Sequence, residues 1–221
     1  MASSENSDIP GLFVARTELL IPSGLAGPAE MSLDVRAFVV DRGEGVVVVD
    51  TLMEPGHVGL VLAALQRSGT DIGQLQFVVL THSHIDHTGG LATLAVLAPQ
   101  AQILCGVGDV EAIHASTGLR PDAIAAGERV GGLEVFPTPG HTPGHLCLFE
   151  PASSTMLLGD LAGNVDGLRR PPAAFTADRH VAEESLRALA ERRFDNAIPS
   201  HGEPIIGGAH GAVARLAASV G

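Results

Sequence analysis

The sequence predicts an α/β (α+β) fold of four layers, in which two β-sheets pack face to face and helices cover the outside. Strand and helix patterns alternate twice along the chain, and each half is β-rich first and contains helices afterwards. The 221 residues are within the range of one domain, and no linker-like stretch divides them. We therefore expect a single domain over residues 11–221, preceded by a disordered segment over residues 1–10.

The first half of the chain predicts a β-hairpin followed by alternating helices and strands. Asp41 to Gly45 form a turn-like segment between two apolar runs, which is typical of a hairpin. Val58, Val61 and Leu65 have helical spacing. The expected strands are 11–20, 33–40, 46–50, 77–80 and 101–106, and the expected helices are 57–67, 91–97 and 109–116.

The second half begins with a glycine- and proline-containing loop over residues 117–127, after which a β pattern returns. A long loop with Gly163, Gly167, Pro171 and Pro172 precedes the last helices. The expected strands are near 130 and at 133–136, 146–150, 155–158 and 195–198, and the expected helices are 177–192 and 208–220.

The densest group of metal-ligand side chains lies in the segment THSHIDHTGG, residues 81–90. An apolar run leads into this segment and two glycines follow, which indicates a buried strand that ends in a tight loop. Side chains alternate along a strand, so His82 and His84 point to one side and can hold the same ion. Asp86 and His87 lie where the chain turns, and a turn can direct them at a second ion.

Four ligands are too few for two ions, and three later segments can supply the others. PTPGHTPGH contains His141, LLGD ends at Asp160 and PSHG contains His201. Each segment is at the end of an expected strand, where loops can converge on the first motif. One such residue alone is more often a hydrogen-bonding turn residue, but together they complete a set of seven ligands.

The segments HSHIDH, PGHTPGH, LLGD and PSHG, in this order, resemble the metallo-β-lactamase superfamily. The resemblance covers nearly the whole chain and implies an αββα sandwich with two metal ions at the sheet edges. It implies that one ion is held by His82, His84 and His141, that the other is held by Asp86, His87 and His201, and that Asp160 bridges them.

Zinc is the expected metal, with two ions per chain, and iron or manganese could use the same nitrogen and carboxylate ligands. Two such ions can share a water molecule and lower its pKa to about 7, which gives a bridging hydroxide beside a Lewis acid. Asp86 and Asp160 are the candidate catalytic residues. The expected reaction is hydrolysis of an activated carbonyl ester, of the thioester, lactone or β-lactam class.

Other polar residues are candidates for support and for substrate contact. Asp50 is expected to hydrogen-bond a ligand histidine or the backbone of the motif loop, because ligating imidazoles donate their other N–H to an acceptor. His145 is expected to support the site beside Asp160, since the family's ligand in PGHTPGH is the first histidine. The candidate substrate contacts are Asn164, Arg169, Arg170 and His210, of which the arginines could bind a carboxylate.

Departures from particular branches of the family restrict the substrate. The chain has no tyrosine, whereas homoserine-lactone hydrolases have one shortly after the bridging aspartate. Residues 163–166 do not match the segment typical of hydroxyacylglutathione hydrolases and persulfide dioxygenases. His84 is unlike the flavodiiron branch, and there is no room for the inserted domain of nucleic-acid-processing members. The alternatives are a mononuclear iron sulfur-oxygenase of the same fold and a non-catalytic metal-binding domain.

Composition restricts the partners to a small-molecule substrate and leaves a homodimer open. The formal net charge is −12, and all 13 basic residues are arginine. An acidic chain without a basic stripe is a poor match for nucleic acid or an anionic membrane. No apolar run is as long as the roughly 18 residues that a membrane-spanning helix needs. The first ten residues do not resemble a signal peptide. Cys105 and Cys147 lie in apolar runs as expected buried thiols, so we expect a cytoplasmic protein.

Overall fold

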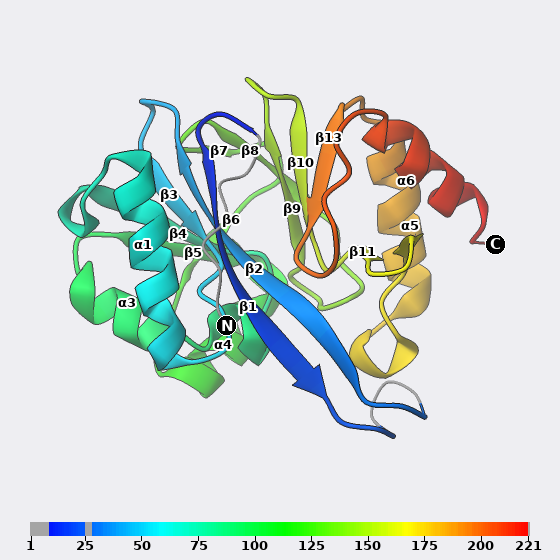
Figure 1. Ribbon diagram of the computed structural model, residues 1–221, viewed down its shortest axis with the longest axis horizontal. Coiled ribbons are helices and arrows are strands. Elements are labelled where there is room, and N and C mark those ends of the chain that lie inside the picture. The colour runs from blue at the N-terminus through cyan, green and yellow to red at the C-terminus, as the bar shows by residue number, and fades with distance from the viewer. Residues whose placement is uncertain (1–8, 25–27, 221) are drawn as a thin grey trace.

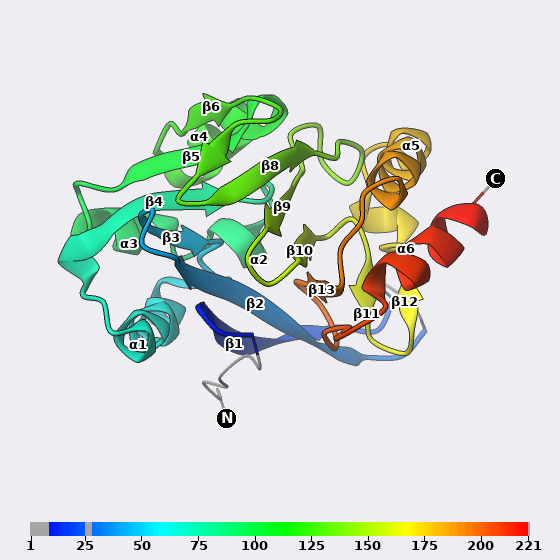
Figure 2. The ribbon, with the colours of Figure 1, turned by 90° about the horizontal axis from the view of Figure 1, so that it is seen from above.

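The computed structural model describes residues 9–24 and 28–220, which fold into four layers (Figures 1 and 2). Helices lie on both outer sides of the molecule, and the strands fill the space between them (Figure 2). This arrangement confirms the predicted αββα sandwich.

The first sheet consists of the N-terminal strands, and helices cover its outer face. Its strands are β1 (Leu12–Ile21), β2 (Met31–Asp41), β3 (Val46–Val49), β4 (Leu75–Leu80), β5 (Gln102–Gly106) and β6 (Asp122–Ile124). They lie side by side in sequence order, antiparallel from β1 to β3 and parallel from β3 to β6. Parallel neighbours need crossover connections, and the covering helices supply them: α1 (Val58–Ser68), α3 (Leu91–Leu97) and α4 (Val110–Thr117).

The second sheet is built from the later strands in the order β13-β10-β9-β8-β7. These strands are β7 (Arg129–Val130), β8 (Leu133–Pro137), β9 (Leu146–Glu150), β10 (Thr155–Gly159) and β13 (Asn196–Pro199). Its pairs are antiparallel except for β10 with β13, which is parallel. Its outer face is covered by α5 (Arg179–Ala190) and α6 (Ala209–Ala218).

Apolar side chains fill each of the three interfaces between the layers. Strand β3 is valine throughout and buried on both faces: Val48 faces the helices of the first half, and Val49 faces the other sheet. This alternation follows from the two-residue period of a strand. Val48 and Val61 share the core between the first sheet and its helices, Val49 and Leu148 share the core between the sheets, and Leu158 and Leu186 share the core between the second sheet and its helices.

Helix ends agree with local sequence signals. The α1 helix ends at Gly69, whose φ of 83° is in the left-handed region that favours glycine. At the start of α5, the Asp178 carboxylate accepts hydrogen bonds from the backbone N–H groups of His180 and Val181. Among the described residues, no helix has both the length and the apolar character needed to cross a membrane.

Several short elements differ from the sequence prediction. Strand β6 lies within the predicted loop 117–127, and the predicted long loop contains a small hairpin of β11 (Gly163–Asn164) and β12 (Leu168–Arg169). A one-turn helix, α2 (Ile85–Thr88), lies within the motif loop. Elements of two to four residues are too short to carry a periodic apolar pattern. The short 3₁₀-helices are η1 (Pro55–His57), η2 (Ile72–Gln74), η3 (Val107–Asp109) and η4 (Ala173–Phe175).

The start of the chain also differs from the prediction of a disordered segment over residues 1–10. Ile9 is buried between the two sheets, and its carbonyl accepts a hydrogen bond from Leu12 N–H at 3.2 Å. Burial of this apolar side chain orders the backbone at this point. Residues 1–8 lie outside the described residues.

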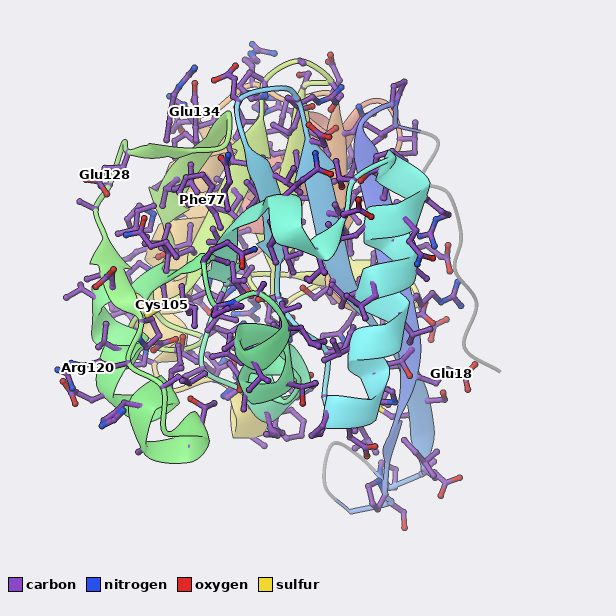
Figure 3. All side chains as sticks on the ribbon, turned by 90° about the vertical axis from the view of Figure 1, so that its left-hand side faces the viewer. Glu18, Phe77, Cys105, Arg120, Glu128 and Glu134 are labelled. Atoms are coloured by element: carbon purple, nitrogen blue, oxygen red, sulfur yellow. The ribbon has the colours of Figure 1, made fainter. Side chains whose placement is uncertain are left out.

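The cysteines are buried thiols, as predicted. Cys105 and Cys147 are both free, and burial raises the pKa of each thiol to about 12. Cys105 is fully buried, whereas the labelled Glu18, Arg120 and Glu128 lie toward the outer margin of the molecule in Figure 3. A thiol with so high a pKa is a poor nucleophile and metal ligand.

Candidate metal centre

The predicted ligands follow strands whose ends meet at one edge of the sandwich. His82 comes two residues after β4, Asp160 directly after β10, and His201 two residues after β13. Backbone hydrogen bonds join the sheets there, since Leu146 N–H donates to the Thr81 carbonyl at 2.8 Å. Side chains from both sheets therefore converge on one place.

Three imidazoles face one another in the first group of ligand atoms. His84 Nδ1 lies 3.1 Å from His82 Nε2 and 3.0 Å from His141 Nε2. Burial lowers the pKa of all three rings, to about 4 for His141. Neutral imidazoles with lone pairs turned to one point are the form in which histidine binds a metal. These residues can hold one ion.

A second group combines a carboxylate with two imidazoles. Asp86 Oδ2 lies 3.5 Å from His87 Nε2 and 3.3 Å from His201 Nε2. Burial alone would lower the pKa of His201, but Asp160 and Asp86 outweigh it and raise this pKa to about 10. The same negative charge favours any cation at this position, including a metal ion.

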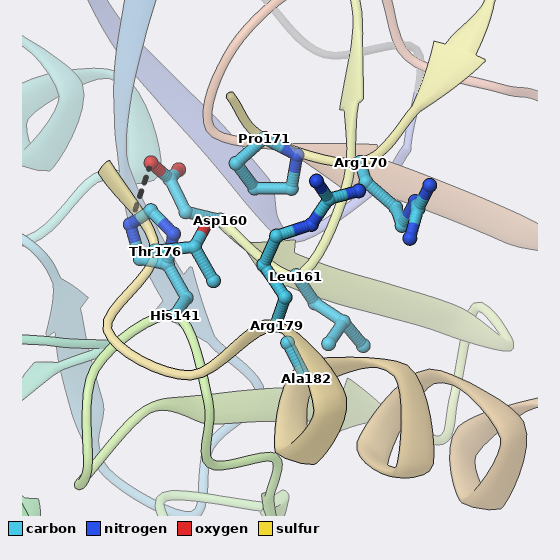
Figure 4. A pocket seen from close by; sticks show the side chains of 8 residues that line it. All are labelled: His141, Asp160, Leu161, Arg170, Pro171, Thr176, Arg179 and Ala182. Atoms are coloured by element: carbon cyan, nitrogen blue, oxygen red, sulfur yellow. Dashed lines mark ion pairs between the residues drawn. The ribbon is translucent and has the colours of Figure 1, made fainter. Parts of the chain in front are cut away.

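Asp160 lies between the two groups. Its Oδ2 atom is 3.4 Å from His141 Nε2 and 3.2 Å from His201 Nε2, and its Oδ1 atom is 3.6 Å from His87 Nε2. Figure 4 shows the contact with His141 as a dashed line. One carboxylate thus reaches ligand atoms of both groups, as a bridging ligand must.

Two orphaned polar atoms show that a metal fits this cluster. His87 Nε2 and Asp160 Oδ1 are buried and have no hydrogen-bond partner among the described residues. A buried polar atom without a partner costs about 1–3 kcal/mol, and a shared cation would satisfy both atoms. The donor set of imidazole nitrogen and carboxylate oxygen suits zinc, and also iron or manganese.

The chain also matches a family of known proteins. Residues 33–201 match the family model described as the metallo-beta-lactamase superfamily. The chain belongs to this superfamily. Metallo-beta-lactamase domain-containing protein 1 of Xenopus laevis is 32% identical, over 79% of this chain and 73% of that protein. Hydroxyacylglutathione hydrolase of Enterobacter sp. (strain 638) is 34% identical, over 49% of this chain and 41% of that enzyme.

Solved structures of metallo-β-lactamases share the fold. The enzyme from Pontibacter korlensis superimposes with a TM-score of 0.77 at 19% identity, and the match covers 99% of each chain. The enzyme from Erythrobacter litoralis superimposes with a TM-score of 0.76 at 20% identity, over 97% of this chain and 95% of that chain. These superpositions show that this superfamily member has the same fold as the two solved enzymes.

Asp50 supports both groups of ligands in this superfamily member. Its carboxylate accepts hydrogen bonds from Thr81 N–H and Thr81 Oγ1, each at 2.8 Å, and from His87 Nδ1 at 2.8 Å. Thr81 Oγ1 also lies 3.1 Å from His82 Nδ1. With Nε2 of each ring turned to the cluster, Nδ1 carries the hydrogen. The φ of 62° at Asp50 is unusual for a residue with a side chain and places the carboxylate under the cluster.

His145 uses both ring nitrogens for support. Its Nε2 atom accepts a hydrogen bond from Asp160 N–H at 2.9 Å, and its Nδ1 atom lies 2.8 Å from Thr138 Oγ1. Burial lowers the pKa of this ring to about 3, so it is neutral. A Cβ atom at Gly159 would lie 2.6 Å from the same Nε2 atom, which explains the glycine in LLGD. His145 therefore fixes the backbone of Asp160.

Asp109 is a supporting residue that the sequence analysis missed. It is fully buried, and its Oδ2 atom accepts hydrogen bonds from Ser83 N–H at 2.9 Å and from Thr142 Oγ1 at 2.6 Å. Its Oδ1 atom accepts a hydrogen bond from Gly144 N–H at 2.9 Å. Close packing adds to this, because a Cβ atom at Gly106 would lie 1.9 Å from the Gly144 carbonyl oxygen. Asp109 thus joins the loop of His84 to the loop of His141.

Two residues of β2 support the loop that carries His201, and the sequence did not predict them. His201 Nδ1 lies 2.6 Å from the Asp34 carbonyl oxygen, which fixes the ring with Nε2 turned to the cluster. The buried Arg36 donates to the Gly202 carbonyl and forms an ion pair with Asp34 at 3.0 Å. An arginine within an apolar strand was the sequence signal for such a buried contact.

The candidate substrate residues have different surroundings. Asn164 Nδ2 donates to the Glu203 carbonyl at 2.7 Å, so this side chain supports the His201 loop. His210 Nδ1 lies 2.8 Å from the Arg192 carbonyl, and its ring packs edge-on against Phe194. His210 thus contacts the segment between α5 and β13 and does not line the pocket beside His141.

Arg170 does line a pocket beside the metal ligands, as Figure 4 shows. The wall opposite His141 and Asp160 contains Arg179, which the sequence analysis did not select. Arg169 donates to the Asp166 carbonyl at 2.9 Å and lines only a neighbouring hollow. The residues of the pocket are His141, Asp160, Leu161, Arg170, Pro171, Thr176, Arg179 and Ala182.

Proposed function

We propose that this protein is a dinuclear zinc-dependent hydrolase of activated carbonyl esters. The observation that supports this most strongly is the position of Asp160 between two complete groups of three ligands. The similarity to hydroxyacylglutathione hydrolase over 49% of this chain supports a thioester substrate, although residues 163–166 depart from the segment typical of that branch. Lactones and β-lactams are the other candidate classes.

When bound, the metal ions supply Lewis acidity that activates water and polarises a carbonyl. One ion would be held by His82, His84 and His141. The other would be held by Asp86, His87 and His201, and Asp160 would be a ligand of both ions. Hydrolysis joins the water oxygen to the carbonyl carbon and breaks the bond from that carbon to sulfur, oxygen or nitrogen. Asp86 and Asp160 are the carboxylates of the cluster, and as ionised groups they can accept a hydrogen bond from the attacking water and orient it. The proton that the water loses passes to the leaving group or to solvent.

The leaving group determines the expected order of substrates. The chain has no tyrosine, and Thr176, a hydroxyl residue of the pocket wall, already donates to the Pro172 carbonyl at 3.2 Å. A poor leaving group therefore finds no free acid among the described residues of this wall. Thiolates and phenolates need less help to leave than alkoxides do.

We therefore expect thioesters and aryl esters to be hydrolysed faster than homoserine lactones. A panel of these substrates, assayed for kcat/KM with the metal-loaded protein, measures this order. Turnover of the lactones alone would show that another residue protonates the leaving group. If no substrate is hydrolysed and the protein consumes oxygen with one iron per chain, the sulfur-oxygenase alternative replaces the hydrolase proposal.

Metal analysis should give close to two ions per chain, with zinc as the main occupant. The reason is the arrangement of seven ligands as three, three and a bridge. The His201→Ala variant, which keeps the His82, His84 and His141 group intact, should retain about one ion. Elemental analysis of both proteins after metal loading and desalting measures this. One ion or fewer in the unmodified protein would contradict the dinuclear proposal.

A further inference from the structure

Two arginines form the wall between the metal ligands and a neighbouring hollow. Arg170, Pro171 and Arg179 line both the pocket beside His141 and a second hollow of about 360 Å³. This volume is within the range of small-molecule sites. Figure 4 shows the Arg170 and Arg179 side chains next to each other, across the pocket from Asp160.

The charge of this wall is not fully compensated. Among the described residues, Arg179 forms no ion pair and no hydrogen bond through its side chain, whereas Arg170 pairs with Glu183. Within the part of the chain that the structure describes, the side chain of Arg169, on the rim of the second hollow, hydrogen-bonds only with the neutral backbone carbonyl of Asp166. Positive charge therefore gathers here although the formal net charge of the chain is −12.

Arg179 is held in a fixed relation to a metal ligand. The backbone N–H of Asp178 donates to the Gly140 carbonyl at 2.8 Å, and that of Ala177 donates to the His141 carbonyl at 3.0 Å. A Cβ atom at Gly140 would lie 2.1 Å from Ala182 N, so the two segments are in close contact. Arg179, the first residue of α5, is thus attached to the His141 loop.

We propose that Arg179, assisted by Arg170, binds a carboxylate on the substrate, so that the natural substrate is an anionic carbonyl ester. A guanidinium group binds a carboxylate through two parallel hydrogen bonds. The hollow gives room for the arm that carries the carboxylate, while the ester carbonyl lies at the metal ligands. The position of the ester carbonyl in this inference rests on the proposed hydrolase function. The recognition of the carboxylate rests on the positions of Arg170 and Arg179.

The test compares thioesters that differ only in charge. One pair is S-phenylacetyl-3-mercaptopropionate and its carboxamide, and a second pair carries the carboxylate or carboxamide on the acyl arm. We expect the carboxylate of at least one pair to have a kcat/KM about tenfold higher, mainly through KM. Arg179→Ala should remove this preference, mainly by raising the KM of the carboxylate substrate to that of the carboxamide. Arg193→Ala, which removes an exposed charge elsewhere, should preserve the preference.

A binding measurement makes the test independent of catalysis. The ketone analogues, in which a methylene group replaces the thioester sulfur, cannot be hydrolysed, and calorimetry gives their affinities. Equal affinities of the carboxylate and carboxamide ketones in the unmodified protein would overturn the proposal. A preference that survives in Arg179→Ala would also overturn it, because another group then recognises the charge. If the ketone preference depends on Arg179 but no thioester is hydrolysed, the anion site stands and the hydrolase function fails.

Discussion

His141→Ala should remove a metal ion and reduce hydrolysis to the background rate, whereas His145→Ala should keep its metal and lose less activity. His141 Nε2 lies within 3.0 Å of another ligand atom and 3.4 Å from the Asp160 carboxylate. His145 has both ring nitrogens engaged elsewhere, with Asp160 N–H and Thr138. Loss of a residue that supports a metal ligand typically costs about 10–100-fold in activity or metal affinity.

Metal content per chain and kcat/KM, measured on the same preparations, separate the two variants. The His145 ring is fully buried, so its removal leaves a cavity that could destabilise the fold. Circular dichroism therefore serves as the check that each variant is folded. His145→Gln is a useful control, since its side-chain oxygen can still accept the hydrogen bond from Asp160. Loss of metal in His145→Ala with the fold intact would show that His145, and not only His141, is a ligand.

The parts of the fold and site that the sequence predicts are those with a local signal. Val46 to Val49 form an apolar run that can only be a buried strand in this context, and the structure has it as β3. His82, Asp160 and His201 each follow such a run, and strand ends from two packed sheets meet at an edge. The long helices also have local signals, such as the apolar spacing of α1 and the Asp178 cap of α5.

The parts that the sequence did not predict depend on contacts between distant segments. The Asp109 carboxylate contacts Ser83 and Thr142, which are 26 and 33 residues away. Its signal was present but weak, because Asp109 follows β5 through glycines much as Asp160 follows β10. Arg179 gave no signal of its own, since its position depends on how α5 packs on the His141 loop. Such packing is set by tertiary contacts rather than by the local pattern.

Asp109→Ala should lower the free energy of unfolding by about 3–5 kcal/mol, because it leaves the buried donors of Thr142 and Gly144 and the half-buried N–H of Ser83 without an acceptor. Most domains have only about 5–15 kcal/mol in total, so the variant should unfold at a much lower urea concentration. The carboxylate also joins the His84 and His141 loops, so metal affinity should fall as well.

Urea unfolding of the metal-free and metal-loaded forms measures both effects. In the metal-free form, the decrease in the free energy of unfolding measures the lost hydrogen bonds alone. A larger decrease in the metal-loaded form shows that the variant also binds metal more weakly. Thr142→Val removes one of the three donors together with its need for an acceptor, so it should cost about 1 kcal/mol. Asp122→Ala, at an exposed aspartate paired with Gln102, should have almost no effect. An Asp109→Ala loss as small as that of Asp122→Ala would mean that water or a rearranged loop replaces the carboxylate, and that the two ligand loops do not depend on this residue.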